Sequence, residues 1–258
     1  LSIAEPAKLT NKLFLRDLTP RKEEDPHCTR ALGWDDPIPH QFQKQWDQMQ
    51  ATCREVESLE IPRSFYPAEH GTPVHQQLFA FADASDLAWC YVIYLRTVTT
   101  NGSILVAFLC GGTKVLPKHV SVKGQLSIPR AELGAAKDLA KKVLEVESQL
   151  DLPNRQPTAY YSDSRVVLAW IKNDITKEPL KRYVTSRIQY ILDVSSPDQW
   201  HYIQTELNPA DLGTRPITVK NLQASCWLSG PAFLLQQDPS PPESPTLQLP
   251  SASFFTHA

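Results

Sequence analysis

Four acidic residues in this chain, Asp83, Glu132, Asp163 and Asp211, are candidates for chemistry. Asp83 and Asp163 end apolar segments and Glu132 lies on an apolar stripe, where a carboxylate is costly to bury, whereas Asp211 lies in a predicted loop. Carboxylates gathered at one point repel one another unless cations lie between them. Hard oxygen ligands of this kind suit Mg²⁺. The chemistry that this set could perform is therefore metal binding and metal-assisted hydrolysis.

Apolar patterns around these acids predict the elements that must position them. Residues 77–82 predict a buried strand that ends at Asp83, and residues 157–162 predict another that ends at Asp163. If the two strands are parallel neighbours, the two carboxylates stand side by side. Glu132 lies in a helix predicted over Pro129–Leu150, and the residues four, seven and eleven positions later are Ala, Leu and Val. Glu132 therefore shares the apolar face of that helix.

Each acid also has a simpler interpretation when it is taken alone. Glu132 fits a first-turn glutamate that interacts with the helix dipole. Asp163 fits a helix N-cap, and Asp211 fits a cap or turn residue. Together, these interpretations require four unrelated acids at the ends of adjoining elements, whereas a single metal site accounts for all of them.

The remaining patterns predict a mixed sheet with helices packed against it. Strands over Trp89–Val98 and Ile104–Gly111, joined by the turn at 100–103, make an antiparallel meander with the first strand. Further elements are a helix from Asp163 through Lys172, a helix over Glu178–Val194, a strand over Gln199–Gln204, and a loop with a short helix over Asn208–Leu222. This order indicates an α/β domain.

Composition divides the chain into three parts. Residues 1–72 are predicted to be a connecting region with one amphipathic helix at about 40–59. Residues 73–235 are predicted to form the α/β domain. Residues 236–258 are rich in proline and serine, a composition that predicts a disordered tail.

The bulk composition bounds the possible partners and compartment. The formal net charge is −2, so any nucleic-acid contact must use locally gathered positive charge or metal ions. No apolar run reaches the roughly 18 residues of a membrane span. The five cysteines are scattered without a zinc-type spacing, which favours reduced thiols in a reducing compartment. Because the chain starts at Leu1 rather than Met, we expect a piece of a longer or processed polypeptide.

Short motifs around the four acids resemble those of retroelement ribonuclease H (RNase H) domains. The motifs are FADAS at 81–85, PRAEL at 129–133, YSDS at 161–164 and NPADL at 208–212. Segments at 32–37, 61–63, 160–164 and 227–234 are similar, more narrowly, to the RNase H region of BEL/Pao-type LTR retrotransposon Pol polyproteins. The likeness covers about residues 30–235.

The resemblance implies an RNase H-like fold with a mixed five-stranded sheet, three antiparallel strands followed by two parallel additions, flanked by helices. It implies cleavage of the RNA strand of RNA–DNA hybrids as part of reverse transcription. Asp83, Glu132, Asp163 and Asp211 would be the catalytic residues and the ligands of two Mg²⁺ ions, for which Mn²⁺ can substitute. Candidate nucleic-acid contacts are Arg130, Lys114, Lys118 and Arg165.

The resemblance also implies the surroundings of the domain. We expect an adjoining reverse transcriptase upstream, to which residues 1–72 would connect, an integrase downstream, and no membrane partner. The expected location is intracellular and cytoplasmic, including a virus-like particle, with the nucleus left open. The alternatives are a catalytically silent RNase H-like nucleic-acid-binding or connection module of a domesticated retroelement, and a DNA-processing enzyme of the same broad superfamily.

One feature departs from the family's pattern. Many retroviral RNases H carry a mobile histidine in the loop shortly before the last aspartate. Here His201 falls within the predicted last strand, and we expect it to be structural. Glu206 lies nearer to Asp211 and is a candidate for part of that loop's role.

Overall fold

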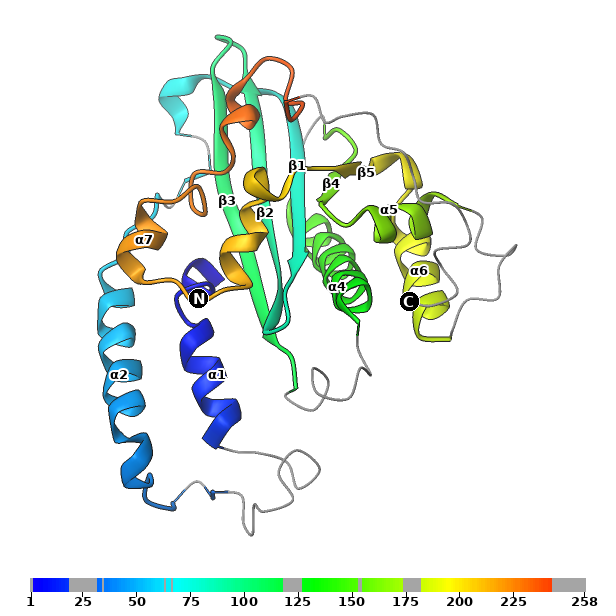
Figure 1. Ribbon diagram of the computed structural model, residues 1–258. Helices are drawn as coiled ribbons and strands as arrows, with labels where there is room; N and C mark the ends of the chain where they lie inside the picture. Colours follow the sequence, from blue (N-terminus) through cyan, green and yellow to red (C-terminus); the bar gives the residue numbers. More distant parts are fainter. Residues whose placement is uncertain are drawn as a thin grey trace.

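A five-stranded mixed sheet, in the order β3-β2-β1-β4-β5, forms the centre of the molecule (Figure 1). The structure is a computed structural model and describes residues 2–18, 32–33, 35–62, 64–65, 67–117, 127–152, 155–173 and 182–242. Among these residues, no helix is long and apolar enough to cross a membrane.

The sheet combines antiparallel and parallel strands. The strands β1 (Pro73–Ala84), β2 (Ala88–Thr99) and β3 (Ile104–Val115) form an antiparallel meander. The short strand β4 (Ala159–Ser162) pairs in parallel with β1, and β5 (Trp200–Tyr202) pairs in parallel with β4. This arrangement confirms the predicted sheet of three antiparallel strands followed by two parallel additions.

Side chains of β1 alternate between two cores, as the period of a strand requires. Leu78, Ala80 and Ala82 face the first core. That core is completed by α4 (Ile128–Gln149), α5 (Arg165–Lys172) and α6 (Arg182–Val194). The helix predicted over Pro129–Leu150 is confirmed as α4, shifted by one residue at each end. The start of the helix predicted from Glu178 lies outside the described residues, and α6 ends at Val194 as expected.

Phe79 and Phe81 face the second core, which the two ends of the chain cover. Its helices are α2 (Gln43–Glu57), α7 (Val219–Gln223) and the 3₁₀ helices η6 (Pro209–Gly213) and η7 (Ala232–Leu235). The helix α1 (Leu9–Leu18) lies next to them, against β3 and α2. Figure 1 shows α1, α2 and α7 on the side of the sheet away from α4 and α6. The buried Trp227 joins both ends, because its indole N–H donates to the Ile3 carbonyl at 2.8 Å.

Residues before 72 share this core with the rest of the described chain. Ala7 is buried against it, and Val56 of α2 packs against it, which gives the predicted amphipathic helix its partner. Lys12 and Arg16 of α1 donate to the carbonyls of Thr113 and Leu116 at 2.7 and 2.9 Å, which covers one end of the edge strand β3. The domain boundary at residue 72 stays a prediction, and of the predicted disordered tail, residues 243–258 lie outside the described part of the chain.

Candidate active site

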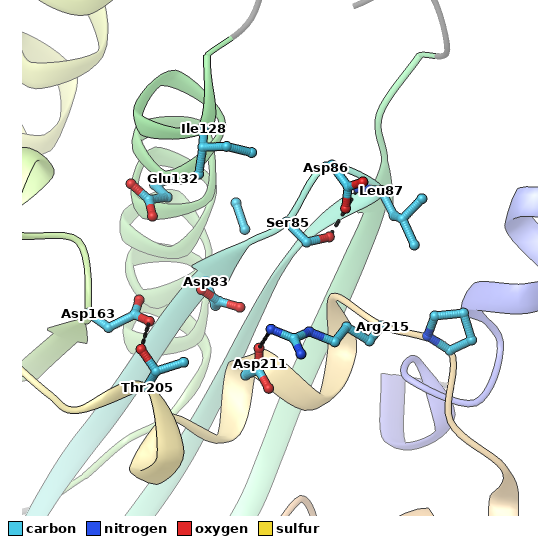
Figure 2. A pocket seen from close by; sticks show the side chains of 12 residues that line it. Asp83, Ser85, Asp86, Leu87, Ile128, Glu132, Asp163, Thr205, Asp211 and Arg215 are labelled. Atoms are coloured by element: carbon cyan, nitrogen blue, oxygen red, sulfur yellow. Dashed lines mark hydrogen bonds and ion pairs between the residues drawn. The ribbon is translucent and has the colours of Figure 1, made fainter. Parts of the chain in front are cut away.

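A single pocket at the end of β1 collects all four acids identified in the sequence (Figure 2). Its lining residues are Asp83, Ala84, Ser85, Asp86, Leu87, Ile128, Glu132, Asp163, Thr205, Asp211, Arg215 and Pro216. Five carboxylates and one guanidinium thus share one depression. Within the described residues, no group of three or more His, Cys, Asp or Glu side chains is arranged to hold a metal ion.

The sheet register brings two of the acids together. Ala82 of β1 pairs with Ser162 of β4 in parallel, so Asp83 and Asp163 follow at the same end of neighbouring strands. The parallel neighbours that the sequence argument required are therefore present. Asp83 is 6% exposed, so most of its carboxyl is removed from water.

The other two acids come from helices on opposite faces of the sheet. Glu132 lies near the N-terminus of α4, just beyond the first turn, on the side of the first core. Asp211 lies in η6, which Asn208 fastens to β1 by donating from its side-chain amide to the Ala82 carbonyl at 3.0 Å. Four separate parts of the chain therefore contribute one carboxylate each: β1, α4, η6 and the connection between β4 and α5.

Each acid is held by a neighbouring side chain. Thr205 donates to Asp163 at 2.7 Å, and Ser164 donates to Glu132. The Thr214 hydroxyl lies 3.1 Å from Asp83, and Arg215 forms an ion pair with Asp211 at 3.3 Å. Three hydroxyls and one guanidinium thus orient the four carboxylates. Sequence reasoning missed all four partners, although Ser164 had a signal, since it directly precedes α5 and accepts from Val167 as its N-cap.

Burial and mutual repulsion raise the pKa of two of the acids. The pKa of Asp83 rises from 3.8 to about 8, first through burial and then through the charges of Asp163 and Asp211. Burial also raises the pKa of Glu132 to about 7, with a further increase from Asp163 and an opposing effect from the Ser164 hydrogen bond. The pocket therefore concentrates more negative charge than the protein alone stabilises near neutral pH.

The described side chains are not arranged as a finished metal site, but the chemistry of the donor set suits divalent magnesium. Oδ1 of Asp163 is buried and has no hydrogen-bond partner among the described residues. A buried, unpaired carboxylate oxygen is costly, and a cation removes that cost. Every candidate ligand is a hard oxygen, the type that Mg²⁺ selects.

The metal-free protein should lose stability as the pH rises from about 4 to about 8. Between these values the folded state retains protons on Asp83 and Glu132 that the unfolded chain has already released, so the free energy of unfolding falls with pH. We expect a fall of several kcal/mol, since each unit of pKa difference between the folded and unfolded states corresponds to about 1.4 kcal/mol. Urea denaturation in EDTA at a series of pH values measures it. The Asp83→Asn variant should show a shallower decline, and a free energy that rises over this interval would contradict the raised pKa values.

Three of the four basic residues proposed from the sequence lie outside the pocket lining. Lys114 lies over the Trp89 ring at 4.8 Å, Arg165 over Tyr202 at 5.1 Å, and Arg130 over Tyr183 at 5.9 Å. Lys118 lies outside the described residues. Their role in nucleic-acid binding stays a prediction, and the cation that does line the pocket is Arg215.

The loop before Asp211 contributes a hydroxyl to the pocket. Thr205 lines the pocket, whereas its neighbour Glu206 is not among the lining residues. His201 lies in β5 beside Tyr161, with ring centroids 5.4 Å apart, and its pKa is lowered mainly by burial. Its side chain belongs to a different depression, next to Lys172.

Comparison with known proteins gives a family match and distant structural likenesses. A sequence model of the family described as "Pao retrotransposon-like RNaseH-like domain" matches residues 1–164. No curated protein matches the chain significantly.

Among solved structures, the N-terminal RNase H domain of a Mycobacterium tuberculosis protein is 10% identical, with a TM-score of 0.32, and the match covers 59% of this chain and 99% of that one. RNase H1 from Halobacterium salinarum is 8% identical, with a TM-score of 0.31, covering 53% and 90%. The prototype foamy virus protease-reverse transcriptase is 17% identical, with a TM-score of 0.34, covering 82% of this chain but only 25% of the viral one.

Proposed function

Because this chain belongs to the family of Pao retrotransposon-like RNaseH-like domains, we propose that it is a metal-dependent endonuclease that hydrolyses the RNA strand of RNA–DNA hybrids during retroelement reverse transcription. The observation that carries the proposal is the convergence of four carboxylates, from four separate parts of the chain, on one pocket. Two of these carboxyls are destabilised as anions by burial, which a bound cation would reverse.

The chain's own residues would bind two Mg²⁺ ions and the scissile phosphate. Asp83 would contact both ions, with Glu132 and Asp163 completing one set of ligands and Asp211 the other. Bound Mg²⁺ supplies charge that stabilises the phosphoryl transition state and makes a water molecule a stronger nucleophile. Ser164 and Thr205 hold two of the carboxylates in place, so less reorganisation is needed when the site fills. Mn²⁺, which accepts the same ligands, can substitute.

Recognition of the substrate would depend on shape and sugar chemistry. The 2′-hydroxyls distinguish RNA from DNA, and base-specific contacts are not expected. The pocket itself is strongly acidic, and the formal net charge of the chain is −2. We infer that the hybrid is bound by basic residues outside the pocket, such as Arg130 and Arg165, and by an adjoining reverse-transcriptase domain. An integrase downstream would complete the polyprotein.

A panel of substrates tests this function. The purified chain would be incubated in about 5 mM Mg²⁺ with one of three labelled substrates of the same sequence: an RNA–DNA hybrid, double-stranded RNA or double-stranded DNA. We expect cleavage of the RNA strand in the hybrid alone, and none in EDTA. Cleavage of the DNA duplex would favour a DNA-processing enzyme of the same superfamily. A silent binding module would bind the hybrid, cut none of the three, and gain no thermal stability from Mg²⁺ or Mn²⁺.

A further inference from the structure

Thr214 is completely buried, and its hydroxyl lies between the carboxyl group of Asp83 and the main chain of Asp211. Its Oγ1 is 3.1 Å from Oδ2 of Asp83 and 2.9 Å from the main-chain carbonyl oxygen of Asp211. Thr214 follows η6 directly, whereas Asp83 ends β1. This side chain therefore connects the element that carries Asp211 to the strand that carries Asp83.

Three other contacts already fix η6 to the sheet. The Asn208 amide donates to the Ala82 carbonyl at 3.0 Å, and the Ser85 hydroxyl donates to the Thr214 carbonyl at 2.8 Å. The Thr113 hydroxyl reaches the Gly213 carbonyl at 3.3 Å. Anchoring of the backbone is therefore shared among several groups, and the Thr214 hydroxyl is not required for it.

The Thr214 hydroxyl has one hydrogen and two possible acceptors, which differ in the other hydrogen bonds they already accept. The Asp211 carbonyl already accepts from the backbone N–H of Thr214 at 3.1 Å. Asp83 has hydrogen bonds from the side chain of Thr214 and from the backbone of Ala84. A buried carboxylate that loses one of two donors is left under-satisfied and free to rotate. Among the contacts of the Thr214 hydroxyl, the hydrogen bond that orients Asp83 is therefore the one that no other side chain replaces.

We propose that Thr214 is a positioning residue, whose hydroxyl fixes the orientation of Asp83 relative to Asp211 so that both carboxylates present oxygens to one divalent cation. The inference rests on the proposed function, because it assigns Thr214 a role in metal binding at that same pocket. It adds to the four acids a neutral side chain that acts through one of them.

Three variants separate positioning from packing. Thr214→Val keeps the shape but removes the hydroxyl, Thr214→Ser keeps the hydroxyl, and Thr113→Val removes a buried hydroxyl that supports η6 without touching an acid. Calorimetric titration with Mn²⁺ alone should show affinity about tenfold weaker in Thr214→Val, and within about threefold of wild type in the other two variants. Single-turnover cleavage of the hybrid should lose rate in Thr214→Val, with little change in the hybrid concentration at half-saturation.

Several outcomes would overturn the inference. If Thr214→Val binds Mn²⁺ as tightly as the wild type, or if Thr113→Val loses as much affinity, Thr214 only packs. Cleavage of the hybrid by the wild-type protein would in that case leave the proposed function standing. A wild-type protein that is folded but neither binds Mn²⁺ nor cuts would overturn the function and the inference together. If Thr214→Val does not fold, Thr214→Ala takes its place, with the same loss expected and the same contrast to Thr214→Ser.

Discussion

Replacing Asp83 with asparagine is expected to lower the rate of RNA cleavage by about 1000-fold or more. Asparagine has nearly the same shape and can keep the contact with Thr214, but it carries no negative charge for a cation. The negative charges of Asp163 and Asp211 both raise the pKa of Asp83, so Asp83 interacts with each of these carboxylates. Its loss therefore removes the ligand that both proposed metal positions share.

The same substitution should stabilise the metal-free protein. At pH 8 in EDTA, Asp83→Asn removes the cost of ionising a buried carboxyl, and we expect a gain of about 1–3 kcal/mol in the free energy of unfolding. Loss of cleavage together with a gain of stability excludes misfolding as the cause. Asp138→Asn is the matched control, because Asp138 lies on α4 outside the pocket and accepts from Trp89 at 3.1 Å. If Asp83→Asn cleaves the hybrid as fast as Asp138→Asn does, Asp83 is not a metal ligand that cleavage requires.

Gly213→Ala is expected to destabilise the protein by about 2–3 kcal/mol and to lower cleavage by about 10- to 100-fold. A Cβ atom on Gly213 would lie 2.1 Å from Sγ and 2.9 Å from Cβ of Cys90. Cys90 is fully buried in β2, so its side chain has no free space into which to move. We expect η6 to move away from the sheet instead, carrying Asp211 with it. Urea denaturation and single-turnover cleavage measure the two effects.

A double-mutant cycle with Cys90→Ala checks the cause. Removing Sγ opens space for the new methyl group, although the contact with the Cys90 Cβ remains. The double variant should therefore be about 1–2 kcal/mol more stable than the sum of the single effects predicts, and part of the cleavage should return. Strictly additive free energies would show that the two residues do not clash.

The sheet, α4 and the places of Asp83, Glu132 and Asp163 could be predicted from the sequence because they follow from local periodicity. Asp211 was proposed mainly because its motif resembles those of RNase H domains. The apolar run before Asp83 fixes a buried strand, and the spacing after Glu132 fixes a helix face. The helix α1 was not predicted, since its ten residues become stable only by packing on β3 and α2. Tertiary packing of this kind leaves little local signal.

The side chains that hold the acids could not be predicted for a related reason. Thr205 meets Asp163 across 42 positions of sequence, and Thr214 meets Asp83 across 131. Threonines at such positions look like ordinary turn residues until the sheet register brings β1, β4 and η6 together. Arg215 was missed in the same way, whereas Arg130, Lys114 and Arg165, which were proposed from the sequence, lie outside the pocket lining.

Single-turnover cleavage of an RNA–DNA hybrid by the unaltered chain tests the central claim most directly. The RNA strand would carry a 5′ label, and the protein would be in large excess so that weak binding does not limit the rate. With Mg²⁺ we predict internal cuts in the RNA that leave 3′-hydroxyl ends, an intact DNA strand, and no cutting in EDTA. An intact RNA strand after incubation with folded, Mg²⁺-saturated protein shown to bind the hybrid would contradict the assignment of the four acids as a nuclease site.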